Sequence, residues 1–179
     1  MYQQVLDFWF KEAGPSTWFD KNLAFDEMLS ERFSELLKRA AAAEFYTWRS
    51  SFEGRLAEII VLDQFSRNIY RNSPSAFAQD PMALTLAQEA VAAGALDKLS
   101  SLDERKFLLM PYMHSESKLI HQQAELLFKD YTDEQTLSYE IRHKVIIDRF
   151  GRYPHRNDIL RRPSSAEEIE FLKQPNSSF

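Results

Sequence analysis

The stretch of sequence that decides the fold is LAEIIVLDQFSRNIYRN, residues 56–72. Its first half is apolar almost all round, and a helix without a polar face belongs in the interior of a helical domain. Its second half carries polar side chains, and Asp63 and Arg67 lie four residues apart, so they share one helical face. Gln64 and Asn68 have the same spacing. Because buried polar groups need hydrogen-bonding partners, we expect other parts of the chain to meet this stretch.

The composition around this stretch favours one helical domain with an aromatic core. A chain of 179 residues fits a single domain, and its 14 Phe, 7 Tyr and 3 Trp indicate that much of the core is aromatic. Only 4 Gly argues against a protein built from strands and tight hairpins. The absence of Cys excludes disulfides, thiolate catalysis and cysteine-ligated metal centres.

Apolar residues recur at helical spacing along the chain, and no segment alternates with the period of a strand. We predict an all-α fold, a single helical domain over residues 1–174 with about seven to eight packed antiparallel helices. The central helix should run from Phe52 to about Tyr70, and a second helix over residues 23–43. Residues 175–179 should form a frayed C-terminal tail.

Several local signals predict where the other helices begin and end. Asp80 followed by Pro81 is typical of a capping acid and a proline at the first helical position. Gly94 and Gly151 should close helices, and Pro111 should end or kink one. The predicted capping boxes are Ser101 with Glu104, Thr132 with Gln135, and Ser164 with Glu167.

The distribution of charge and apolar residues limits the partners. The N-terminal segment MYQQVLDFWFKEAG lacks the features of a signal peptide, and no run approaches the roughly 20 apolar residues of a membrane span. We therefore expect a cytoplasmic protein without membrane contact. Residues 141–163 hold seven Arg or Lys against two Asp in a chain of net charge −5. This basic segment could hold an anion or dock on the protein's own acidic surface, but nucleic-acid binding normally needs a larger basic face.

Three polar clusters follow apolar helices or lie where a helix breaks. The first consists of Asp63, Gln64, Arg67, Asn68 and Arg71. The second consists of His114, Ser115, Glu116 and Ser117 with His121 and Gln122, and the third of Arg152, His155, Arg156 and Asn157. Arginine offers a rigid fork for carboxylate or phosphate, and asparagine offers both a donor and an acceptor. The alternative is that Asp63 with Arg67, and Glu116 with Arg152 or Arg156, hold helices in register. The candidate ligand-binding residues are Asp63, Gln64, Arg67, Asn68, His114, Glu116, Arg152, His155, Arg156 and Asn157.

The histidines and serines give weaker signals for catalysis. His114 and His121 with a nearby glutamate could form a metal set, but no HExxH motif is present, and we predict no metal and no cofactor. His143 has the spacing of an ordinary surface residue. Ser115 and Ser117 lack the strand–turn–helix elbow of a serine nucleophile, and no glycine-rich phosphate loop is present.

The motifs VLDFWF, LDQFSRNIYR, MHSE and FGRYPHRN together resemble the bacterial domain-of-unknown-function family number 924 over nearly the full length. The sequence has Ser66 where that family usually has proline, and Arg161 also departs from its pattern. The resemblance implies an all-helical, right-handed array similar to tetratricopeptide-repeat (TPR) proteins, and it brings no established activity. The positions that match the family's motifs are Asp63, Gln64, Arg67, Asn68, His114, Ser115, Glu116, Gly151, Arg152, Pro154, His155, Arg156 and Asn157.

We expect a binding module that holds a small anion or an acidic peptide in a groove lined by Arg, Asn and His. The first alternative is an enzyme, a hydrolase or lyase, that uses His114 or His155 with a carboxylate partner such as Glu116. The second is a structural or oligomerisation role in which the polar clusters act as helix clamps. No oligomeric state is predicted. The position of the three clusters relative to one another decides among these functions.

Overall fold

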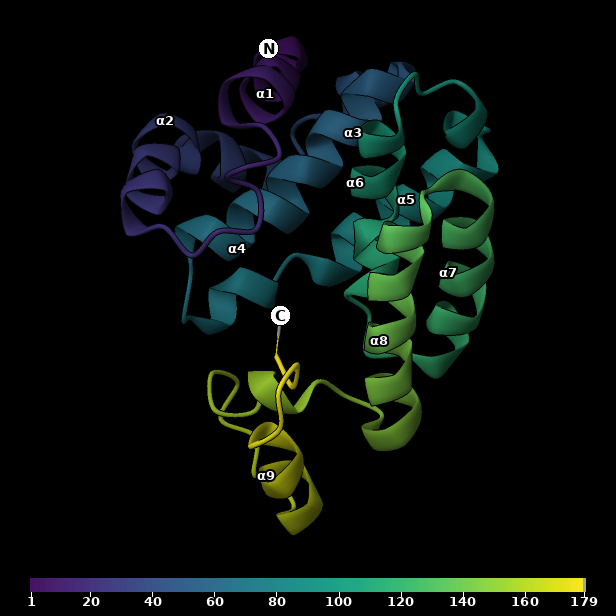
Figure 1. The fold of residues 1–179 in the computed structure, drawn as a ribbon. Helices are drawn as coiled ribbons and strands as arrows, with labels where there is room; N and C mark the ends of the chain where they lie inside the picture. Colours follow the sequence, from purple (N-terminus) through teal and green to yellow (C-terminus); the bar gives the residue numbers. More distant parts are fainter. Residues whose placement is uncertain (179) are drawn as a thin grey trace.

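The computed structural model describes residues 1–178, which form helices and connecting turns without a strand (Figure 1). This confirms the predicted all-helical class. The elements in chain order are α1 (Tyr2–Asp7), η1 (Phe8–Ala13), α2 (Leu23–Ala41), η2 (Tyr46–Ser50), α3 (Phe52–Ile60), η3 (Val61–Phe65), α4 (Ser66–Ile69), η4 (Pro74–Phe77), α5 (Asp80–Ala92), η5 (Ala95–Asp97), α6 (Leu102–Met113), α7 (Lys118–Tyr131), α8 (Glu134–Phe150), η6 (Pro154–Arg156) and α9 (Ala166–Leu172).

The central helix exists, but it is not a uniform α-helix. It consists of α3, the π-helical turn η3 and the short α4, which follow one another directly. A π-helical turn is rare and often lies at a functional site. The predicted helix is confirmed from Phe52 to Ile69, but a spacing of 3.6 residues does not register the wider turn at η3.

An aromatic core fixes the orientation of this central helix. The ring of Phe65 lies 5.0 Å from that of Phe33, 5.6 Å from Trp9 and 6.0 Å from Phe8, measured between centroids. All four side chains are buried. Because Phe65 is held in this way, the polar residues that precede it in η3 face the opposite side, toward α6.

Several predicted helix ends are corrected by tertiary contacts. Pro111 does not end α6, which continues to Met113, because the buried packing of this segment outweighs the loss of one backbone donor. Asp80 is the first residue of α5 and not its cap, because its carboxylate binds arginine side chains. Asp133 caps α8 in place of Thr132, whose hydroxyl donates to a backbone carbonyl. The last capping box pairs Ser165 with Glu168, one residue later than predicted.

The C-terminal third of the chain forms one side of the molecule. Helices α7 and α8 stand side by side, and the segment after Gly151 runs beneath α8 to α9 (Figure 1). Gly151 adopts the left-handed conformation that the predicted helix end requires, with φ of 70°. Ser177 is buried and donates to the Leu172 carbonyl, whereas Phe179, the last residue of the predicted tail, lies outside the described residues.

The pairing of neighbouring helices is compatible with a TPR-like array. Adjacent helices pack against one another, notably α5 with α6, α6 with α7 and α7 with α8. Over residues 1–178, no helix is both long enough and apolar enough to cross a membrane.

Candidate functional site

The π-helical turn places the carboxylate of Asp63 in the interior. Its Oδ1 lies 2.7 Å from His114 Nδ1 and 3.0 Å from Arg67 Nη1. The amide of Gln64 donates to its Oδ2. Burial alone would raise the pKa of Asp63, but the charge of Arg67 and the contacts from His114 and Gln64 outweigh it and hold that pKa below its ordinary value. Asp63 is therefore an ionised acceptor.

His114, at the C-terminal end of α6, has a defined tautomer because its partner is a carboxylate. An ionised carboxylate only accepts hydrogen bonds, so His114 Nδ1 carries the proton and Nε2 carries the lone pair. Burial and the nearby charge of Arg67 lower the pKa of His114, despite the opposing effect of Asp63. The imidazole is therefore neutral at neutral pH.

Two arginines share the carboxylate of Asp80, at the start of α5. Arg67 binds it with both ends of its guanidinium group, at 2.8 and 3.0 Å. Arg156 approaches one of the same oxygens at 3.4 Å. The guanidinium of Arg156 also lies over the rings of Phe77 and Tyr153, at 4.6 and 4.5 Å from their centroids. Arg156 is thus held mainly by aromatic faces, and its buried Nε has no hydrogen-bond partner among the described residues.

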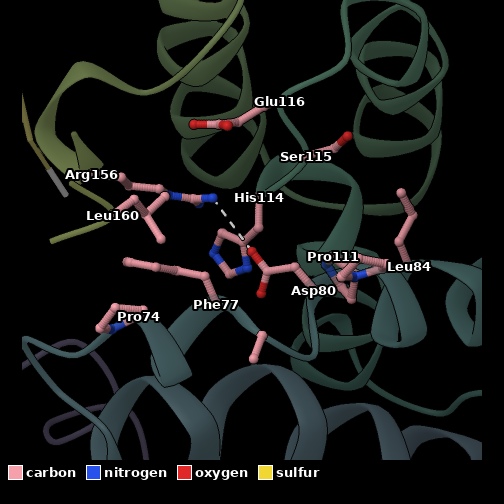
Figure 2. A pocket seen from close by; sticks show the side chains of 12 residues that line it. Pro74, Phe77, Asp80, Leu84, Pro111, His114, Ser115, Glu116, Arg156 and Leu160 are labelled. Carbon is pink, nitrogen blue, oxygen red and sulfur yellow. Dashed lines mark hydrogen bonds and ion pairs between the residues drawn. The ribbon is translucent and has the colours of Figure 1, made fainter. Parts of the chain in front are cut away.

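These groups meet at a cleft of about 390 Å³. In Figure 2 the guanidinium group of Arg156 points toward Asp80, and the ring of His114 lies beside this pair. Asp63 and Arg67 do not line the cleft, but they contact His114 and Asp80, which do. The residues that line the cleft are Pro74, Phe77, Ala78, Asp80, Pro81, Leu84, Pro111, His114, Ser115, Glu116, Arg156 and Leu160. Each of the three polar clusters of the sequence therefore contributes to one cleft or to the contacts directly behind it.

Other predicted residues of the first cluster serve the helix packing instead. Asn68 donates to Asp26 of α2 at 3.0 Å, and Arg71 binds both oxygens of the same carboxylate. Asp26 is buried, so these contacts fasten α2 to the end of the central helix. Neither side chain lines the cleft.

The third cluster is divided between the cleft and the C-terminal helix. Arg152 binds Glu168 of α9 with two hydrogen bonds, at 2.7 and 2.8 Å. Asn157 donates to the Ser164 hydroxyl and accepts from Arg162. Arg152 and Asn157 fasten the segment after α8, and the pair of Arg152 with Glu168 supports docking of the basic segment on the protein's own acidic groups.

The predicted pairing of Glu116 was wrong, because Glu116 binds Arg162 and neither Arg152 nor Arg156. Two hydrogen bonds of 2.6 and 2.9 Å join Glu116 to Arg162, and the backbone N–H of Tyr153 donates to the same carboxylate. Burial would raise the pKa of Glu116, but these contacts lower it overall. Sequence analysis missed Arg162, whose only signal was its place in the basic segment.

The remaining histidines lie away from the cleft lining. His143 is buried, contrary to its expected surface position, and burial lowers its pKa to about 3. Burial, and then the charge of Arg156, lower the pKa of His155 to about 4. His121 is fully buried between α7 and α8. In the described part of the chain, no group of three or more Asp, Glu, His or Cys side chains is suited to a metal ion.

A buried network supports the backbone on both sides of His114, and sequence analysis did not find it. The hydroxyl of Tyr153 donates to the Met113 carbonyl at 2.5 Å. His121 Nε2 donates to the Ser115 carbonyl at 2.8 Å, while its Nδ1 lies 2.7 Å from Glu140. Burial raises the pKa of Glu140. These contacts hold the residues before and after His114 in place.

The fold and the site together define an all-helical protein with a buried aspartate–histidine pair beside one cleft. The chain belongs to the family described as "Bacterial protein of unknown function (DUF924)", whose model matches residues 5–176. It is similar to a solved structure of a protein of unknown function, ATU0120, from Agrobacterium tumefaciens. The two are 38% identical, superpose with a TM-score of 0.91, and match over 96% of each chain. No match was found among curated proteins.

Proposed function

We propose that the cleft binds a small organic anion with an apolar body. The observation that carries this proposal is the state of Arg156, which is 6% exposed and lines the cleft. Its one ion pair among residues 1–178 is the 3.4 Å contact with Asp80. Asp80 is already bound by Arg67 at shorter distances, so a ligand carboxylate would give Arg156 a partner of its own.

The other arginines around the cleft are less suited to this role. Arg67 is shared between Asp63 and Asp80, and Arg162 is bound by Glu116. Their charges are matched within the protein, so a bound anion would have to compete for them. This favours one anionic group in the ligand over a polyanion.

The rest of the cleft lining supports an apolar body in the ligand. Phe77, Leu84 and Leu160 present carbon atoms around the polar end. A volume of about 390 Å³ lies at the lower end of the range of small-molecule sites, roughly 300–1,000 Å³. A short aliphatic or aromatic carboxylic acid therefore fits better than an acidic peptide, which would need a longer groove.

The test is a titration of the protein with hexanoate and benzoate, followed by NMR, and with the matching neutral amides. We expect the carboxylates to bind and the amides to bind at least about tenfold more weakly, because a hydrogen bond to a charged group is worth about 1.5–3 kcal/mol. Arg156→Gln should lose this preference. Arg149→Gln, which removes an exposed arginine paired with Glu167, is the matched control and should behave as the wild type. Equal binding of acids and amides would refute the proposal.

A structural role is the second candidate, and a separate observation favours it. Arg71 joins the segment after α4 to Asp26 of α2, and Arg152 joins the segment after α8 to Glu168 of α9, through two hydrogen bonds each. These pairs act as helix clamps whether or not the cleft binds a ligand. Their loss should lower stability without changing the preference for carboxylates.

A further inference from the structure

We propose that the Asp63–His114 pair makes this cleft catalytic, with His114 as the general base that activates water to hydrolyse an ester bond in the bound molecule. The inference rests on the proposed function, because it uses the same cleft. It adds a reaction class, a catalytic residue and a positioning residue. The contacts of the ring, its place in the cleft wall and the charges around it carry the argument.

The geometry fixes the ring of His114 with one nitrogen engaged. Its Nδ1 lies 2.7 Å from Asp63 Oδ1, and Asp63 is itself held by Arg67 and Gln64. The carbonyls on both sides of His114 are bound by the buried side chains of Tyr153 and His121. A ring held at Nδ1 and placed in the wall of a cleft offers Nε2 as its proton acceptor.

The charges around the ring suit a base that works near neutral pH. Burial and Arg67 keep the pKa of His114 below its ordinary value, so the ring is ready to accept a proton. Once it has done so, the ionised Asp63 faces the new positive charge across one hydrogen bond. Asp63 is therefore a positioning residue that sets the tautomer and stabilises the imidazolium.

Water is the nucleophile that fits these contacts. Among the described residues, Asp63 is the only hydrogen-bond partner of the His114 ring, so no serine, threonine or tyrosine hydroxyl is positioned for activation. A hydroxyl nucleophile would need to lie within hydrogen-bond reach of the base. We therefore assign the proton that Nε2 accepts to a water molecule next to the substrate.

The reaction balances without a further reactant. His114 Nε2 takes a proton from water while the water oxygen bonds to the acyl carbon, and the carbonyl electron pair moves onto its oxygen. Arg156, in the cleft wall, meanwhile holds the carboxylate of the bound ester. The intermediate then collapses, the bond to the alcohol oxygen breaks, and that oxygen takes the proton from Nε2. Ester and water give acid and alcohol, and the base is restored.

The first test measures hydrolysis of two p-nitrophenyl esters, the anionic mono-glutarate and the neutral butyrate. We expect turnover by the wild type and a loss of at least about 100-fold in kcat for His114→Gln, the lower end of what general-base catalysis contributes. Arg149→Gln is again the control. Circular dichroism of each variant verifies that it is folded.

The two proposals fail in different ways. If both esters are hydrolysed through His114 at equal rates, the catalytic inference holds and the anion preference is wrong. If carboxylates bind in the NMR titration but the wild type hydrolyses neither ester faster than His114→Gln, the catalytic inference is overturned and the binding site stands.

A second test uses the wild type alone, in case His114→Gln does not fold. Bromoacetamide is neutral, and its carbon bonds to an unprotonated imidazole nitrogen as bromide leaves. Peptide mapping should find His114 alkylated at Nε2, while the buried His121 and His143 stay unmodified. The rate should begin to fall at a lower pH than the alkylation of a free imidazole does, because the pKa of His114 is lowered. Alkylation of His114 no faster than that of the two buried rings would show that Nε2 is closed to the cleft, and would overturn the inference.

Discussion

Gly54 is the glycine at which a single added methyl group should disturb the packing of the central helix most directly. It is the third residue of α3, where the chain leaving η2 crosses the start of the central helix. A Cβ atom at Gly54 would lie 2.1 Å from the carbonyl oxygen of Trp48 and 2.9 Å from its carbon. Ordinary contact begins at 3.4 Å, so about 1.3 Å of space would have to be opened against backbone atoms.

The expected magnitude follows from two opposing effects. An alanine in a helix is usually about 1 kcal/mol better than a glycine. Forcing an extra carbon into a packed site costs about 1–3 kcal/mol, and more when backbone must move. With a contact this short, the upper end of that range applies, so Gly54→Ala should lower the free energy of unfolding by about 2 kcal/mol. For a chain of this size, that corresponds to a fall of about 4–8 °C in melting temperature.

The assay is guanidinium denaturation followed by far-UV circular dichroism. Glu53→Ala is the matched control, because Glu53 is the preceding, exposed residue of the same helical turn. It should change stability by less than about 1 kcal/mol, the usual limit for an exposed charge at a helix end. If Gly54→Ala proves as stable as the wild type, the close approach of Trp48 to α3 is not a constraint and the reasoning is refuted.

Three further predictions concern the groups behind the cleft. Tyr153→Phe leaves the Met113 carbonyl without its donor and should cost about 1–3 kcal/mol in denaturation. The pKa of His143 is lowered to about 3 in the folded protein, whereas an unfolded chain protonates this histidine near pH 6.5. The free energy of unfolding should therefore fall as the pH drops below 6.5, by about 2 kcal/mol at pH 5. His143→Gln should flatten this dependence in urea titrations at several pH values. Glu140→Gln should cost less than about 1 kcal/mol, because burial disfavours the charged form of Glu140 and raises its pKa, and a glutamine amide can still donate to His121; a loss of about 3–5 kcal/mol would show a charged pair instead.

Residues 56–72 alone predicted that polar side chains from other parts of the chain contact the central helix. A buried helix that carries Asp63 and Arg67 must find donors and acceptors, and the sequence supplied them after two helix ends. The structure brings His114 to Asp63 and Arg156 to Asp80, as that requirement suggests. The chemical type of each partner could therefore be inferred, because a buried charge needs a hydrogen-bonding or oppositely charged group next to it.

The particular pairs could not be predicted, because they depend on distances that no local pattern encodes. Asp80 before Pro81 is a strong capping signal. Its carboxylate instead forms a partly buried bidentate pair with Arg67, which is a stronger interaction than a hydrogen bond to a helix end. His143 looked like a surface residue because helix α8 is polar on several sides. The segment after Gly151 covers it, through the ring of Tyr153 at 5.7 Å, and that contact depends on how the chain turns back.

Arg67 shows why a helix clamp and a functional group need not be different residues. It joins the central helix to α5 through Asp80, which is a structural contact. Its charge also keeps Asp63 ionised and lowers the pKa of His114, which is the condition for a base that is neutral yet backed by a carboxylate. Replacing Arg67 would therefore change stability and base strength together, so it cannot separate the two roles. Arg71, which clamps α2 through Asp26 and is absent from the contacts of His114, changes stability alone. Variants that replace Arg67 or Arg71 can be compared by the pH at which bromoacetamide alkylation of His114 falls by half. The difference between the two variants isolates the effect of Arg67 on the base strength of His114.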